Sequence, residues 1–231
     1  MSVRSARLTG KGYYYAFLAG AKKILENQKE LNRINVFPVP DADTGSNLAS
    51  TVKAIIERVR PHRSFEVVSA AIAAAALEGA RGNSGVIFAQ FLYGLSAESC
   101  DSHEVSVARF GQSVQGAVRY MYEAIAEPQE GTMITVIRKW AEAMAARREG
   151  PESFLKVLAR AQARAVEALH ETRHRLEAMR RADVVDGVLF PHTCDSIQGL
   201  ATLAPDFGGW GKPALRFLHP KGEDRESARA F

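Results

Sequence analysis

The sequence has few of the features that mark several large classes of protein. It has only two cysteines, Cys100 and Cys194, which lie far apart and lack CxxC spacing. This argues against a disulfide framework and against a zinc site. The first residues lack the apolar core of a signal peptide, and no uninterrupted apolar run reaches about 18 residues, so we expect no membrane span and a cytoplasmic location.

Patterns typical of β-strands are also rare. Alternating apolar and polar residues are almost absent, whereas apolar residues recur at helical spacing over most of the chain. This spacing predicts helices over residues 12–34, 64–80, 84–96, 104–126, 132–149 and 152–181, and one more that begins near Gly45–Ser46 and ends before Pro61. We therefore predict an all-α bundle or barrel of about eight helices.

The charged residues do not indicate a nucleic-acid partner. The formal net charge is +4, but Lys and Arg are scattered along helical stretches and form no stripe with interleaved aromatic residues. A solvated surface is the better interpretation, and we expect no binding to nucleic acid.

One stretch, "NVFPVPDADTGSN" (Asn35–Asn47), breaks the helical pattern with two prolines and then sets Asp41 and Asp43 one residue apart. Neither proline can continue a helix, and each favours an extended residue before it. The two carboxylates can converge on one Mg²⁺ ion, which prefers oxygen ligands. An ordinary Pro-Asp turn explains the same residues, so the stretch alone leaves both interpretations open.

The residues that follow are those expected at the beginning of a helix. Thr44, Ser46 and Asn47 fall where free backbone N–H groups and the helix dipole favour a phosphate, and Gly45 permits close approach of the backbone. The alternative is that these polar residues are ordinary N-caps.

Three further stretches are weaker signals. "GARGNSG" (Gly79–Gly85) can present several N–H groups to an anion, or it is a helix–helix turn capped by glycines. "EGTMITV" (Glu130–Val136) contains a candidate cap and a methionine suited to an adenine face, or it is a capped helix with a core methionine. Asp186, at the end of "RRADVVD", is by default a solvated loop residue.

Taken in order, these stretches resemble the ATP-binding domain of the dihydroxyacetone-kinase L-subunit type. The chain is most similar to the N-terminal domain of fatty acid kinase A and of kinases fused to a DegV-type domain. The resemblance rests on "LNRINVFPVPDADTGSN", where the family typically reads LNxLNVFPVPDGDTGTN, on "GARGNSGVIFAQFL" and on "EGTMITV". It implies an eight-helix barrel that holds ATP or ADP with Mg²⁺ at one end.

The resemblance also implies roles for individual residues. Asp41 and Asp43 match metal-binding carboxylates, with Asn35 completing the metal site, and Thr44 joins the two aspartates in the catalytic group. Thr44 stands where the dihydroxyacetone branch has His. The remaining positions match nucleotide contacts: Ser46, Asn47, Gly82, Asn83, Ser84, Thr132, Met133 and Asp186. Arg81, a cation beside the site, is a candidate phosphate partner.

The expected activity is that of a kinase component that forms an acyl phosphate on a chain held by a DegV-like fatty-acid-binding protein or another acceptor-presenting protein. The resemblance also leaves a homodimer open. Two alternatives stand beside it: a glycerone phosphotransferase like the dihydroxyacetone-kinase L-subunit, and a nucleotide-binding remnant without turnover.

The similarity to the family pattern stops at Asp186. The family continues approximately VVDAGGQGL, whereas this chain reads VVDGVLFPHTCDS and becomes rich in glycine and proline. We therefore divide the chain into a kinase domain, residues 1–186, and an atypical tail, residues 187–231, and we expect the final helix of the barrel to be missing or altered. Our hypothesis is a truncation or a shifted reading frame, which the coding DNA can test.

Overall fold

The computed structural model describes residues 7–33, 35, 41–146 and 152–180, with side chains described as far as Glu171. This part of the chain forms eight α-helices and two short strands, which confirms the all-α fold class. In chain order the elements are β1 (Arg7–Thr9), α1 (Gly10–Glu26), α2 (Gln28–Arg33), α3 (Thr44–Arg58), α4 (Phe65–Gly79), α5 (Gly82–Glu98), β2 (Glu104–Ser106), α6 (Val107–Glu123), α7 (Met133–Ala145) and α8 (Phe154–Arg180).

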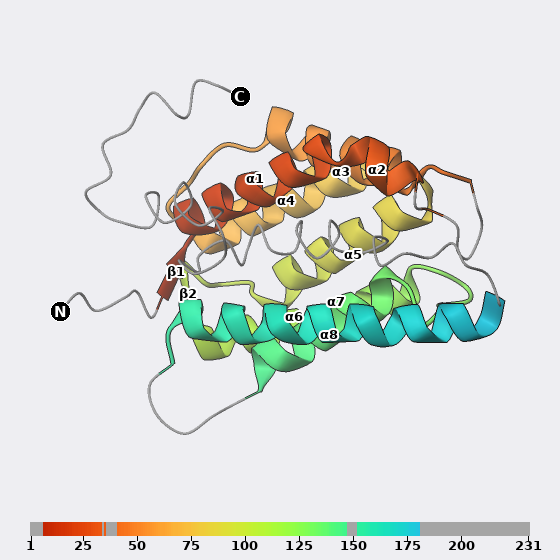
Figure 1. The fold of residues 1–231 in the computed structure, drawn as a ribbon. Helices are drawn as coiled ribbons and strands as arrows, with labels where there is room; N and C mark the ends of the chain where they lie inside the picture. Colours follow the sequence, from red (N-terminus) through yellow and green to blue (C-terminus); the bar gives the residue numbers. More distant parts are fainter. Residues whose placement is uncertain (1–6, 34, 36–40, 147–151, 181–231) are drawn as a thin grey trace.

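The long helices alternate in direction, and neighbours in the sequence pack against one another from α3 through to α8 (Figure 1). Helix α3 also lies against α1, α2 and α5. One continuous apolar core joins these helices, and its largest fully buried side chains include Trp140, Tyr13, Phe65, Phe91 and Phe110. Burial of a phenylalanine such as Phe65 contributes about 1.5–3 kcal/mol relative to an exposed position.

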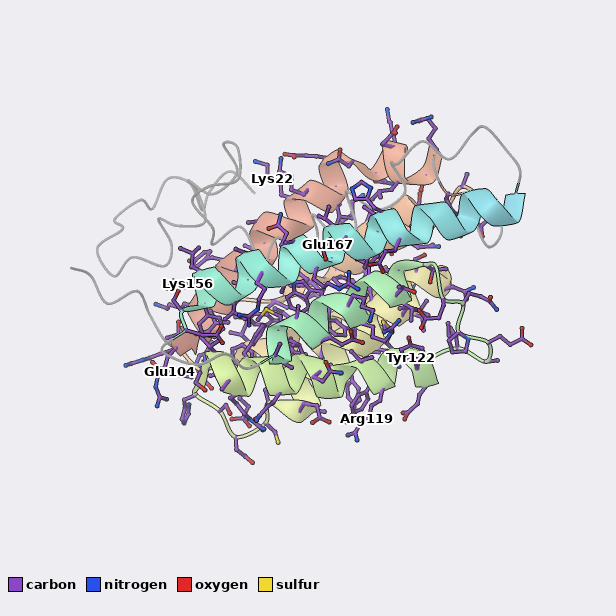
Figure 2. The ribbon with its side chains drawn as sticks, turned by 60° about the horizontal axis from the view of Figure 1, so that its bottom comes forward. Lys22, Glu104, Arg119, Tyr122, Lys156 and Glu167 are labelled. Atoms are coloured by element: carbon purple, nitrogen blue, oxygen red, sulfur yellow. The ribbon has the colours of Figure 1, made fainter. Side chains whose placement is uncertain are left out.

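Charged residues lie on the outer faces of the helices. Figure 2 shows Lys156 and Glu167 on the outside of α8, and both are exposed. Among the residues that the structure describes, no helix is both long enough and apolar enough to cross a membrane.

Alternation of direction brings the beginnings of α3, α5 and α7 to the same end of the molecule, drawn at the right in Figure 1. These three helices open with the three glycine- and threonine-containing motifs that the sequence singles out. The beginnings of α3 and α5 are 38 positions apart in the chain, and those of α5 and α7 are 51 positions apart. The structure nevertheless places all three at one end.

The structure corrects one boundary in the first helical stretch. Residues 12–34 were expected to form one helix, but α1 ends at Glu26 and a separate short helix, α2, begins at Gln28. The side-chain amide of Asn27 donates to the carbonyl of Lys23 at 2.9 Å and so caps α1. The break lets α2 turn across the beginning of α3, with which it packs.

A two-stranded antiparallel sheet is present that the periodicity did not predict. Leu8 pairs with Val105, and both side chains are buried. Residues 104–106 had been assigned to the helix over 104–126, and this assignment is wrong. Each strand has only three residues and runs directly into a helix capped by Thr9 or Ser106, so neither is long enough to show alternation.

Candidate functional site

The turn before α3 carries two carboxylates, those of Asp41 and Asp43. Asp43 occupies the N-cap position of α3, but its side chain makes no capping hydrogen bond. Asp41 is exposed, and its Oδ1 accepts a hydrogen bond of 2.5 Å from the buried amide of Asn35. Neither aspartate forms an ion pair with a described residue. An ordinary capping role therefore does not explain why an aspartate stands at position 43.

The residue between the two aspartates has a left-handed backbone. Ala42 has φ 53°, a conformation that side chains bearing a Cβ rarely adopt. The corresponding position of the family motif is glycine. The sharp turn that separates the two carboxylates is thus maintained here against backbone strain.

Helix α2 holds the first turn of α3. A Cβ on Gly45 would lie 2.2 Å from the carbonyl oxygen of Gln28, so only glycine permits this approach. Ser46 is bound at two points by Asn32: the Ser46 N–H donates to Asn32 Oδ1 at 2.9 Å, and Asn32 Nδ2 donates to Ser46 Oγ at 2.9 Å. The Ser46 N–H, which the sequence suggested for a phosphate, is consequently occupied by Asn32.

The beginning of α5 lies directly against the beginning of α3. Gly82 has φ 54°, and a Cβ there would lie 2.1 Å from the Nδ2 of Asn47, which is buried. The Thr44 and Ser84 hydroxyls lie 3.3 Å apart. The sequence showed only that the aspartate motif precedes the glycine-rich motif. In the structure the two motifs lie against each other and form one surface, through Thr44 and Ser84 and through Asn47 and Gly82.

Arg81 does not reach into this surface. Its guanidinium donates to the carbonyls of Glu78 at 3.3 Å and Ala80 at 2.7 Å, at the end of α4. The guanidinium thus satisfies carbonyls at the end of a helix, as cationic groups often do. The role of Arg81 as a phosphate partner stays a prediction.

The third motif begins α7. Thr132 is the N-cap of this helix, and its hydroxyl accepts from the N–H of Ile134 at 3.4 Å. Met133 is buried in the core. Their assignment to the wall of a nucleotide pocket stays a prediction. So do the assignments of Asn83, which is exposed at the beginning of α5, and of Asp186, which lies outside the described residues.

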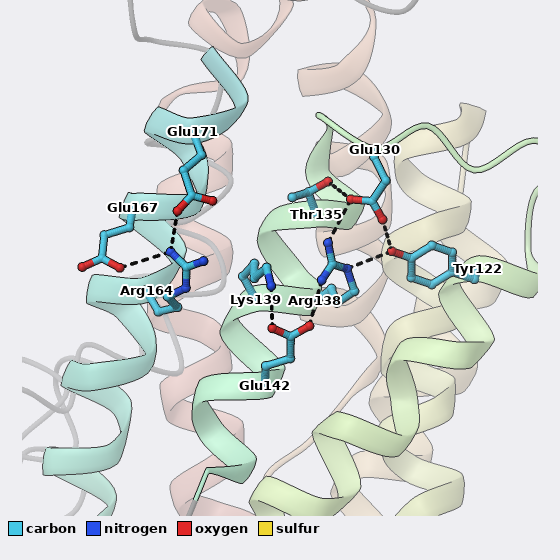
Figure 3. A network of polar contacts seen from close by, with 9 residues as sticks. All are labelled: Tyr122, Glu130, Thr135, Arg138, Lys139, Glu142, Arg164, Glu167 and Glu171. Atoms are coloured by element: carbon cyan, nitrogen blue, oxygen red, sulfur yellow. Dashed lines mark hydrogen bonds and ion pairs between the residues drawn. The ribbon is translucent and has the colours of Figure 1, made fainter. Parts of the chain in front are cut away.

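A polar network holds the turn before α7 (Figure 3). Arg138 donates to Glu130 at 3.1 Å, to Tyr122 at 3.1 Å and to Glu142 at 2.8 Å. Tyr122 and Thr135 also donate to Glu130. Sequence reasoning missed this network, because its members come from α6, α7 and the loop between them.

The network shifts the acidity of its members. Partial burial favours the protonated form of Glu130, but hydrogen bonds from Thr135, Tyr122 and Arg138 outweigh it and hold the pKa of Glu130 at about 2. Burial, followed by the hydrogen bond to Glu130, raises the pKa of Tyr122 to about 12. At neutral pH Glu130 is therefore an anion and Tyr122 a neutral donor.

The donor set at the turn before α3 fits a magnesium ion. Asp41 and Asp43 supply carboxylate oxygens, and the Asn35 amide uses its nitrogen toward Asp41, which leaves its oxygen for a ligand. The described part of the chain contains no group of three or more His, Cys, Asp or Glu side chains that could hold a metal ion. A metal here would therefore keep positions for water or for phosphate oxygens.

Comparison with known proteins is consistent with this geometry. The model of the DAK2 domain family matches residues 38–194, which is more than half of the chain and extends past Asp186. Over 188 residues the chain is 31% identical to Protein YloV of Bacillus subtilis, covering 80% of this chain and 34% of that protein. It is 32% identical over 183 residues to an uncharacterized protein of Staphylococcus epidermidis, covering 78% of this chain and 33% of that protein. The matched segment thus spans about one third of the length of these curated relatives.

Proposed function

Because the chain belongs to the DAK2 domain family, whose domains bind ADP or ATP, we propose that it is an Mg-ATP-dependent phosphotransferase acting in the cytoplasm. One observation carries this proposal. The turn that carries Asp41 and Asp43, which form no ion pair with a described residue, meets the glycine-rich beginning of α5, with Thr44 and Ser84 3.3 Å apart. Carboxylates for a metal and helix N-termini for phosphates are thereby combined on one surface.

In this proposal the position of each group of residues suggests its role. Asp41, Asp43 and Asn35 hold Mg²⁺, which neutralises charge on the phosphates when it is bound. Gly82 lets the N-terminus of α5 approach a phosphate closely, because no Cβ covers its N–H. Phosphoryl transfer needs positioning and charge neutralisation more than a protein nucleophile, so this inventory is sufficient.

We further propose that the acceptor is an acyl chain and that the product is an acyl phosphate, as the resemblance to fatty acid kinases implies. A DegV-like fatty-acid-binding protein is our candidate for the partner that presents this acceptor. Glycerone is the alternative acceptor. A nucleotide-binding remnant without turnover is the alternative of another class, motivated by the sequence after Asp186.

Calorimetric titration with ATP, with and without Mg²⁺, tests the nucleotide and metal assignments. We expect wild-type protein to bind ATP more tightly with Mg²⁺ and expect Asp43→Asn to lose this dependence on the metal. Asp101→Asn is the matched control, because Asp101 is an exposed acid in the loop between α5 and β2 and has a left-handed φ of 61° that Asn tolerates. An unchanged Mg²⁺ effect in Asp43→Asn would contradict the metal assignment.

Turnover separates the acceptor classes. ATP hydrolysis or transfer is measured with glycerone, with a fatty acid alone, and with a fatty acid loaded on a DegV-like protein. Transfer only in the last case supports the acyl-phosphate proposal. Nucleotide binding without transfer to any of the three supports the remnant.

A further inference from the structure

The orientation of the Asn32 amide is fixed by a group that can only donate. The backbone N–H of Ser46 lies 2.9 Å from one side-chain atom of Asn32, and this atom must be the oxygen, because a backbone N–H accepts nothing. The nitrogen of the same amide then faces Ser46 Oγ, at 2.9 Å. The two contacts together exclude a flipped amide.

This orientation decides what the Ser46 hydroxyl can do. An amide nitrogen only donates, so Ser46 Oγ accepts from Asn32 at 2.9 Å. One lone pair of the oxygen is thereby engaged, and the hydroxyl proton cannot point toward Asn32. The side-chain amide of Gln28 lies 3.3 Å from the same oxygen, and Ser46 is exposed.

We propose that Asn32 is a positioning residue that makes Ser46 a hydrogen-bond donor to a phosphate oxygen of the nucleotide. This inference rests on the proposed function and deepens it. A hydroxyl oxygen that already accepts from Asn32 is a poor metal ligand, so in this proposal Ser46 contacts the phosphate while Asp41 and Asp43 hold Mg²⁺.

The scaffold around Asn32 keeps this arrangement rigid. Leu31 is fully buried, and Gly45 allows α2 to touch the first turn of α3 without an intervening side chain. Asn32 therefore has little freedom to release Ser46 when a ligand arrives, and the donor is preorganised.

The substitution Asn32→Asp reverses the polarity of the contact without changing its shape. The carboxylate still accepts from the Ser46 N–H, but its second oxygen accepts from the Ser46 hydroxyl, which then turns away from the ligand. We expect the affinity for ADP without metal to fall roughly tenfold or more, the usual loss when a hydrogen bond to a charged group is removed. Ser46→Ala should cause a similar loss.

The double variant Asn32→Asp/Ser46→Ala separates this mechanism from charge repulsion. If Asn32 acts through the Ser46 hydroxyl, the double variant binds ADP no more weakly than either single variant. If the new charge simply repels phosphate, the two losses multiply. Gln115→Glu is the control for charge, since it adds a carboxylate at an exposed position of α6, and it should keep ADP affinity within about twofold.

Calorimetric titration of the folded variants decides the matter, with thermal unfolding to verify the fold. Unchanged ADP affinity in Asn32→Asp, multiplicative losses in the double variant, or a changed Mg²⁺ requirement in Ser46→Ala would each overturn the inference while leaving the proposed function intact. If wild-type protein binds neither ADP nor ATP, the proposed function fails, and the inference about Ser46 fails with it.

Discussion

The Thr44 hydroxyl lies 3.3 Å from the Ser84 hydroxyl, although 40 positions separate the two residues in the chain. Thr44 begins α3 and Ser84 lies in the first turn of α5. Their contact is the point at which the aspartate turn and the glycine-rich loop become one surface. Several properties of the protein should depend on how closely these two helix beginnings approach.

Gly82 should be intolerant of any side chain. Gly82→Ala places a Cβ 2.1 Å from Asn47 Nδ2 and strains a left-handed backbone, so we expect a loss of about 2 kcal/mol or more in the free energy of unfolding, together with weaker nucleotide binding. Gly82→Asn tolerates the left-handed conformation better but brings the same Cβ. Denaturant unfolding of both variants separates the causes: wild-type stability in Gly82→Asn would show that strain alone matters and would contradict the packing argument.

Ala42→Gly should stabilise the protein. The left-handed φ of 53° costs an alanine about 1–2 kcal/mol, whereas glycine adopts it freely but loses more entropy on folding, so we expect a net gain of about 1 kcal/mol or less in the free energy of unfolding. Ala74→Gly is the matched control. It makes the same change at an exposed position inside α4 and should destabilise by about 1 kcal/mol. Destabilisation by both would argue against the strained turn.

Acid should weaken the network around Glu130. Its pKa is about 2 in the folded protein against an ordinary value of 4.5, so the contribution of Glu130 to stability is fully present above about pH 4.5 and is lost as the pH falls toward 2. We expect the difference in unfolding free energy between wild type and Glu130→Gln to shrink over this window. Denaturant titrations at several pH values measure it. A difference that stays constant with pH would contradict the ionised state of Glu130.

Arg138 should matter more to stability than another paired arginine in the neighbouring helix. Arg138 bonds three groups from two helices and a loop, and Arg138→Met leaves Glu130 and Glu142 without their shared cation. We expect a cost of about 1–2 kcal/mol. Arg164→Met removes a cation that pairs with Glu167 and Glu171 along one exposed face of α8, and should cost about 0.5 kcal/mol or less (Figure 3). Equal costs in thermal unfolding would mean that the network adds nothing beyond surface pairing.

The sequence was sufficient to predict most of the helices. Residues 64–80 were expected to be helical and form α4 over Phe65–Gly79, and residues 152–181 contain α8. Apolar residues at helical spacing carry this information locally, and caps such as Thr132 mark where a helix begins. The strand pair was missed because three residues are too few for alternation, and the break at Asn27 was missed because helical spacing continues across it.

The candidate site was only partly accessible from sequence. Asp41 and Asp43 were identified because two acids beside prolines and before a helix form a recognisable local pattern. Asn32 was quoted within the motif, but its role was not predicted, since its hydrogen bonds to Ser46 span 14 positions. Arg138 sits in an ordinary helical stretch, and no local signal marks it.

By itself, the sequence determined the helical class, the order of the motifs and the presence of two carboxylates in the turn before α3, because periodicity, proline and residue type act over a few positions. Only the tertiary structure decided that Gly82 packs on Asn47 and that the Asn32 amide donates to the hydroxyl oxygen of Ser46. Such contacts depend on how closely helices approach, and that approach is set by the packing of the whole core around residues without a Cβ.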